Sequence, residues 1–215
     1  MDVVLDNLDV YVEGFTTTLR LTLAAAAVAL VLGTLVAAMR VSPVPPLRAA
    51  GTLYVNVVRN TPLTVVFFIV VFGLPQVDTV LSFFQFGVLA LSVYTAPFVA
   101  EAVRSGINSV PAGQAEACRA VGMTFTQTLR LVVLPQAFAN AVPPLASVFI
   151  ALLKNTSIAS AFFLPEALQR TQGLINANGQ AVLWILAGTA VGYLFLALIA
   201  SVLFGLLERS LAVAR

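Results

Sequence analysis

The chain of 215 residues is 60% hydrophobic and only 9% charged, and its mean hydropathy is +1.01. Soluble domains are about 45–50% apolar and about 25% charged, so this composition excludes an ordinary soluble protein. It predicts an all-α polytopic membrane protein that lies in a lipid bilayer, and we expect no nucleic-acid partner. At about 20 residues per crossing, the length allows five or six helices in one domain, residues 1–215.

Several classes of chemistry are excluded by missing residue types. The chain has no histidine and a single cysteine, Cys118, which excludes a histidine or cysteine metal site and a Ser-His or Cys-His nucleophile. It also lacks the Gly-x-x-x-x-Gly-Lys-Ser/Thr phosphate loop, so it does not itself hydrolyse ATP in the usual way. We therefore expect a protein without bound cofactor, and any energy source must be external.

Five apolar runs are separated by polar or proline-containing connections. They predict membrane helices at about 15–39, 47–74, 84–104, 136–160 and 182–207, with a long polar loop at about 105–135 between the third and the fourth. The second run contains Arg59-Asn60-Thr61-Pro62, and Pro62 should kink the helix there. The last run contains Gly188 and Gly192, a spacing that permits close helix packing.

The distribution of charge predicts the orientation, because arginine and lysine mark cytoplasmic loops. With five helices and the N-terminus outside, the C-terminus is cytoplasmic and so is the polar loop. The cytoplasmic segments then hold Arg40, Arg48, Arg104, Arg119, Arg130, Arg209 and Arg215. The outer segments hold Asp2, Asp6, Asp9, Glu13, Asp78 and Glu166 against Arg170.

Lys154 stands inside an apolar helix, where an ammonium group is costly and usually marks a polar interior or a pathway. Counting from Pro135 places it roughly 28 Å along the fourth helix, in the outer half of the membrane. Snorkelling of the side chain to the outer head groups is the alternative. The adjacent Asn155-Thr156-Ser157 favours a substrate site, since three polar side chains suit a carboxylate or amide better than lipid.

Arg59 and Glu101 both fall in the inner third of the membrane by the same counting. An unpaired charge there would be costly, so we expect the two to pair across the second and third helices. The alternative is that Arg59, with Asn60 and Thr61, forms part of a substrate path.

The polar loop contains Glu116-Ala117-Cys118, followed by Gly122 and by Leu134-Pro135. This pattern resembles the EAA loop of the permease subunits of ATP-binding-cassette importers, and it departs at Cys118, where the family usually has alanine. Four further segments look like the polar amino-acid branch of this family, so the resemblance covers most of the chain. They are Ser109 to Gln114, Val133 to Ala137, Arg59 to Leu63 and Leu153 to Ser157.

The resemblance implies a type I (MetI-like) permease fold and a coupling role for the loop. A short helix around Gln114 to Val121, set off by Gly113 and Gly122, would be seated in a partner ATPase and transmit its ATP-driven closure. The coupling residues would be Glu116, Ala117, Cys118, Arg119 and Gly122. A plain solvated loop held by a Glu116–Arg119 salt bridge is the alternative that the residues alone would favour.

The resemblance also implies the partners. They are two cytoplasmic ATPase subunits that bind ATP and magnesium, a second permease, and an extracellular substrate-binding protein. The likeness to actinobacterial glutamate permeases favours a heterodimer over a homodimer of permeases. In relatives that carry basic amino acids an aspartate often stands at the position of Asn155, so Lys154 without an adjacent acid favours glutamate or aspartate.

Two other functions are consistent with an apolar chain of this length. An ion-coupled secondary carrier would need an intramembrane carboxylate relay or an internal repeat, and only Glu101 is available for a relay. A membrane scaffold or sensor without transport would have no need for the pattern in the polar loop.

Overall fold

A computed structural model describes residues 2–212, and helices form almost all of this part of the chain. The first half holds α1 (Asp2–Leu5), α2 (Leu8–Val41), α3 (Pro45–Arg59), α4 (Leu63–Phe68), the π-helix η1 (Ile69–Gly73), the 3₁₀-helix η2 (Leu74–Val77) and α5 (Phe83–Asn108). The second half holds α6 (Ala112–Ala120), α7 (Phe125–Thr128), the π-helix η3 (Leu129–Val133), α8 (Leu134–Asn155), the 3₁₀-helices η4 (Thr156–Phe162) and η5 (Gly179–Ala181), α9 (Ala167–Ala177) and α10 (Val182–Ala212).

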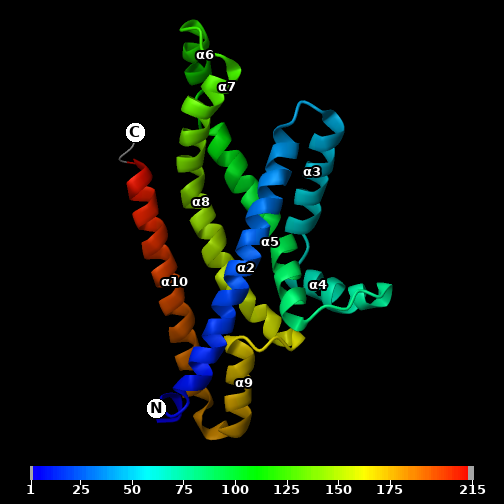
Figure 1. The fold of residues 1–215 in the computed structure, drawn as a ribbon. Helices are drawn as coiled ribbons and strands as arrows, with labels where there is room; N and C mark the ends of the chain where they lie inside the picture. The colour runs from blue at the N-terminus through cyan, green and yellow to red at the C-terminus, as the bar shows by residue number, and fades with distance from the viewer. Residues whose placement is uncertain (1, 213–215) are drawn as a thin grey trace.

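The long helices form an elongated bundle with two different ends (Figure 1). One end carries α6, α7, the α2–α3 turn and the last turns of α10, and we call it the α6 end. The opposite end carries α1 and α9, and we call it the α9 end. Within residues 2–212, four helical segments are long and apolar enough to cross a membrane. A fifth is reached when α3 and the α4 segment, which is residues 63–77 (α4, η1 and η2), are taken together as one broken span.

Close packing of α2 against α5 forms the centre of the bundle. The buried face of α2 is built from small residues three or four positions apart, including Ala25, Ala29, Gly33 and Ala37. A Cβ on Gly33 would lie 2.6 Å from the Val99 side chain and 2.7 Å from a carbonyl oxygen of α5. The two backbones are therefore in direct contact, as expected where small residues meet inside a membrane.

The helix expected at 47–74 with a kink at Pro62 is broken into two helical segments that meet at 104°. Pro62 provides no backbone N–H and disfavours a helical conformation at Thr61, so α3 ends at Arg59 and α4 begins at Leu63. The α4 segment then projects sideways from the bundle (Figure 1). The bend leaves Arg59, Asn60 and Thr61 at a helix end.

The two glycines of α10 pack within the chain. Gly188 lies against Tyr11, and Gly192 accommodates the ring of Phe15, so both face α2 near the α9 end. The spacing thus serves the contact between α10 and α2.

Glu166 is a completely buried carboxyl group that ties three helices together at the α9 end. It caps α9 by accepting a hydrogen bond from the Gln169 backbone N–H at 2.9 Å. Its other oxygen accepts hydrogen bonds from Tyr193 of α10 at 2.6 Å and from Thr18 of α2 at 3.5 Å. Burial raises the pKa of Glu166 above its ordinary value of 4.5, although these donors act in the opposite direction.

The raised pKa of Glu166 predicts a pH-dependent stability. Between the ordinary and the raised pKa the folded state binds more protons than the unfolded state, so stability rises as pH falls toward 4.5 and is lost as pH rises through the raised value. Thermal unfolding of the purified protein in detergent across this window should show the dependence, and Glu166→Gln should remove it. Asp9→Asn, the matching change at an exposed carboxylate, should leave the pH dependence in place. If Glu166→Gln and the wild type showed the same dependence of stability on pH, the assignment of that dependence to Glu166 would be contradicted.

Candidate functional site

The position of α3 against α5 is fixed by a hydrogen bond that a proline makes necessary. Pro97 lies inside α5 and has no N–H, so the carbonyl of Val93 one turn earlier loses its helical partner. The Tyr54 hydroxyl of α3 donates to this carbonyl at 2.7 Å. Arg59, five residues further along α3, is thereby held beside α5.

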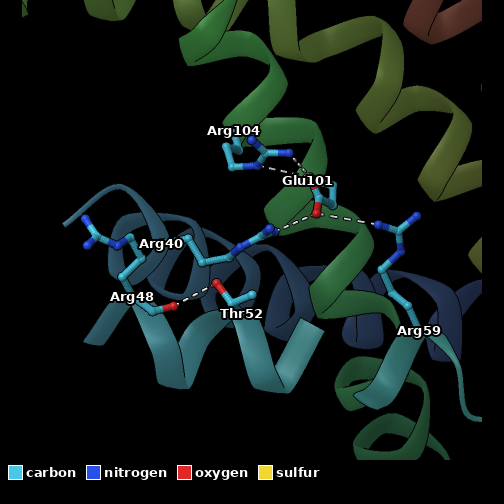
Figure 2. Close-up of polar contacts among 6 residues, drawn as sticks. All are labelled: Arg40, Arg48, Thr52, Arg59, Glu101 and Arg104. Atoms are coloured by element: carbon cyan, nitrogen blue, oxygen red, sulfur yellow. Dashed lines mark hydrogen bonds and ion pairs between the residues drawn. The ribbon is translucent and has the colours of Figure 1, made fainter. Parts of the chain in front are cut away.

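Glu101 of α5 is the centre of an ionic cluster with Arg40, Arg59 and Arg104, which we call the Glu101 cluster (Figure 2). Arg40, from the end of α2, lies 2.6 Å from Oε1, and Arg104 contacts Oε2 through Nη2 at 2.8 Å and Nε at 3.1 Å. Arg59 lies 3.5 Å from Oε1. The predicted Arg59–Glu101 pair is confirmed, and two further arginines join it.

Arg59 also contacts the wall of a cavity between α5 and α8. Its guanidinium carbon lies 5.4 Å from the centre of the Phe98 ring, a cation–π contact. Phe98 lines a cavity of about 300 Å³. Its polar lining residues are Tyr94, Thr95, Ser147 and Asn155. The cavity is thus apolar with a few hydroxyl and amide groups, as is usual for small-molecule sites.

One face of α8 carries polar residues along most of its length. Gln136, Asn140, Ser147 and Lys154 follow one another at spacings of four and seven residues, which places them on the same side of the helix. Ser147 and Lys154 are exposed, and no side chain among residues 2–212 bonds Lys154. Exposure of such a face to lipid would be costly, which favours contact with water or another protein over snorkelling of Lys154 to the head groups.

The remaining predicted substrate residues differ in their accessibility. Asn60 and Thr61 donate to carbonyls of the last turn of α3, at 2.7 and 2.8 Å. Thr156 is completely buried, and its hydroxyl donates to the Leu153 carbonyl at 2.6 Å. Ser157 donates to the Lys154 carbonyl at 2.8 Å. Only Asn155 of this set lines the cavity, with Lys154 adjacent to it on α8.

A short helix, α6, lies where one was predicted around Gln114 to Val121, but it begins after Pro111 and includes Gly113. Gly122 ends it with φ +82°, while the N–H groups of Gly122 and Met123 donate to the carbonyls of Arg119 and Cys118, each at 3.0 Å. This Schellman geometry needs a residue that tolerates a left-handed conformation. Cys118 is the buried residue of α6.

Charged residues on α6 are free to contact another protein. Glu116 and Arg119 are both exposed, and the salt bridge considered for them does not form. Ala117 is exposed beside them. The EAA pattern therefore leaves its polar side chains at the surface and buries Cys118 toward the rest of the chain.

The tip around α6 also exposes large apolar side chains that the sequence analysis did not single out. Val121 is 78% exposed and Phe125 is 80% exposed, at the extreme α6 end. The sequence signal that could have identified them is the presence of large apolar residues in an otherwise polar loop. Such a patch is typical of a protein–protein contact.

The chain matches the family model described as binding-protein-dependent transport system inner membrane component, over residues 29–213. It is 37% identical over 211 residues to the probable glutamine ABC transporter permease protein GlnM of Bacillus subtilis, covering 98% of this chain and 97% of the relative. It is 40% identical over 213 residues to the glutamate transport system permease protein GluC of Corynebacterium glutamicum, covering 94% and 93%.

Two solved structures are similar along nearly the whole chain. A crystal structure of an amino acid ABC transporter with histidines matches with a TM-score of 0.89 and 31% identity, covering 96% of both chains. The inward-facing MetNI methionine ABC transporter matches with a TM-score of 0.75 and 22% identity, covering 96% and 98%, which shows the shared fold.

The end of α6 offers a paired test with two glycines. Gly122→Ala forces an alanine into a left-handed conformation and should destabilise the end of α6 by about 1 kcal/mol. Gly113→Ala is the matched control, because no atom lies within 4 Å of the added Cβ and alanine favours helix. Hydrogen exchange of the α6 amides should accelerate in Gly122→Ala and not in Gly113→Ala. Equal exchange in the two variants would contradict a structural need for glycine at 122.

Proposed function

Because the chain belongs to the family of inner-membrane components of binding-protein-dependent transport systems, we propose that it is one permease subunit of an importer for polar amino acids, with glutamate and aspartate as the first candidates. The chain is a permease, and the ATPase of such transporters is a separate subunit. The protein is a multi-pass protein of a bacterial plasma membrane. Neither the secondary carrier nor the scaffold finds support in the comparisons.

The proposed partners occupy opposite ends of the bundle. The α6 end faces the cytoplasm, because the described arginines of the predicted cytoplasmic segments gather there, while Arg215 lies outside the described residues. Two ATPase subunits that bind ATP and magnesium dock at the α6 end of the permease pair, one on α6 of this chain. The substrate-binding protein docks at the α9 end. These placements are supported by the exposed tip around Val121 and Phe125 and by the acidic residues near the N-terminus.

A second permease completes the pathway, as a different chain or as a second copy. Ser147 and Lys154 on α8 are exposed and the cavity beside Phe98 is open in a single chain, and polar groups inside a membrane need a protein or aqueous neighbour. Two permeases that face each other across these surfaces would enclose a path. Coupling at α6 would then open the path to one side of the membrane at a time.

The positive charge around the cavity is the observation that supports an acidic amino acid as the substrate. The cavity and its surroundings hold positive charge without a free carboxylate: Lys154 lies on α8, and Arg59 stacks on the cavity wall. Glu101 is the nearby acid, and three arginines surround it. A negatively charged amino acid fits this charge distribution better than a basic one. The relatives named for glutamate and glutamine are consistent with it.

Lys154, Asn155 and Arg59 are the residues that we assign to the substrate carboxylates. Lys154 supplies a mobile ammonium group, Asn155 supplies an amide at the cavity, and Arg59 supplies a planar guanidinium. Asn60, Thr61, Thr156 and Ser157 shape the helix ends on which these three stand, because their side chains bond to local carbonyls.

The decisive test is uptake of a panel of labelled amino acids into proteoliposomes. The panel should contain glutamate, aspartate, glutamine, arginine and histidine, and the assembly should contain both permeases, the ATPase and the binding protein. We expect glutamate or aspartate uptake that requires ATP and the binding protein. Uptake that is independent of both would refute the importer, and a preference for arginine or histidine would refute the substrate class alone.

Lys154→Met should raise the KM for uptake about tenfold or abolish uptake, because a charge-assisted hydrogen bond to the substrate is lost. The ATPase should still copurify with the variant. Lys154→Arg should retain part of the uptake, and Arg20→Met removes an exposed cation from another helix as the matched control. Unchanged glutamate uptake in Lys154→Met would remove Lys154 from the site.

A further inference from the structure

We propose that Glu101 is a built-in competitor for the substrate carboxylate: it binds Arg59 when no substrate is present, and so it limits how tightly a substrate is retained before release. The inference rests on the proposed function and concerns the release step of that same path. It assigns to Glu101 a positioning role that acts through Arg59.

The charges of the Glu101 cluster are unequal. Three guanidinium groups, each charged at every physiological pH, surround one carboxylate, so the cluster carries two positive charges in excess. Such an excess inside or near a membrane favours the approach of an anion. Arg48, the next arginine along the chain after Arg40, lies apart from Glu101 and does not take part (Figure 2).

The three arginines do not hold Glu101 equally. Arg104 occupies Oε2 with two N–H groups, and Arg40 makes a short contact to Oε1 while its side chain is only 13% exposed. Arg59 shares Oε1 with Arg40 at 3.5 Å, forms no hydrogen bond among the described residues, and is 44% exposed. Arg59 is therefore the loosest of the three, and its N–H donors remain available.

Arg59 is also the member that contacts the cavity. Its guanidinium packs on the Phe98 ring, and that ring lines the cavity together with Asn155. The guanidinium thus contacts both the Glu101 carboxylate and the cavity wall. A substrate carboxylate that leaves the cavity on this side meets a planar group with donors suited to bind it in a bidentate manner.

Exchange between the two carboxylates is energetically inexpensive. When a substrate binds Arg59, Glu101 keeps Arg40 and Arg104, so no carboxylate is left unpaired. When the substrate leaves, Glu101 takes Arg59 back, so no cation is left unpaired. Without Glu101 the departure of substrate would leave Arg59 uncompensated, and the substrate would be held more tightly.

The test is inhibition of uptake by unlabelled glutamate on the release side. Proteoliposomes that contain the complete transporter are loaded with ATP and increasing glutamate, and uptake of labelled glutamate is measured to obtain an inhibition constant. Glu101→Gln should lower this constant roughly tenfold, the scale of a hydrogen bond between charged groups. Glu101→Asp, which keeps the charge, should restore most of the wild-type value.

A control of opposite sign uses Arg104. Arg104→Gln frees Oε2 and leaves Glu101 less neutralised, so Glu101 should bind Arg59 more strongly and the inhibition constant should rise roughly threefold, as for an exposed ion pair. Adding Arg59→Gln to Glu101→Gln should abolish the effect of the latter. A merely structural Glu101 would change the maximal uptake rate or the yield of assembled complex and leave the inhibition constant unchanged.

The outcomes separate this inference from the proposed function. If the wild type shows uptake driven by ATP and binding protein while Glu101→Gln and Arg104→Gln leave the inhibition constant unchanged, the inference is overturned and the importer stands. If the two variants shift the constant in opposite directions, the inference is supported. If the wild type shows no such uptake, both are rejected.

Discussion

The contact between α2 and α5 determines where the functional groups of this chain lie. Its closeness depends on residues such as Gly33, which leaves space for Val99 and a backbone carbonyl of α5. The same contact brings the end of α2, with Arg40, to Glu101 of α5. Because α3 follows α2 through a short turn and bonds to α5 through Tyr54, Arg59 arrives at the same carboxylate from a third helix. The Glu101 cluster is therefore a direct product of helix packing.

A second constraint comes from the membrane itself, where polar groups need partners. The chain satisfies several of them internally: Tyr54 bonds the carbonyl that Pro97 leaves free, and Glu166 joins α9 to α2 and α10. Two residues of the polar face of α8 are different, because Ser147 and Lys154 form no bond to another helix within residues 2–212. The distinction separates the parts of the chain that are complete alone from the part that requires a neighbour.

Much of this organisation could be predicted from the residues, because apolar runs and proline positions act locally. The Arg59–Glu101 pair followed from counting the depth of each residue along its helix, and Gly122 as the end of α6 followed from its conformational freedom. Arg40 could not be added to the cluster, since its distance of 61 residues from Glu101 is closed only by the packing of α2 on α5. The break at Pro62 followed from the proline itself, but its angle of 104° did not, and the burial of Glu166 depends on neighbours from α2 and α10 that no local pattern identifies.

The last helix, α10, differs from α2 and α5 in how much of it packs within the chain. Only 6% of the most apolar window of α10 is buried within the chain, and its contacts with α2 are concentrated near Gly188 and Gly192. Further along, α10 also packs on α8, where the Phe204 ring lies 5.3 Å from the ring of Phe149, and Ala200 is buried. On the remaining, exposed surface of α10, leucine, isoleucine, valine and phenylalanine should be interchangeable, whereas the contact between α2 and α5 accepts few substitutions. Sequence information in this protein is thus unevenly distributed, and divergence between relatives should concentrate on α10.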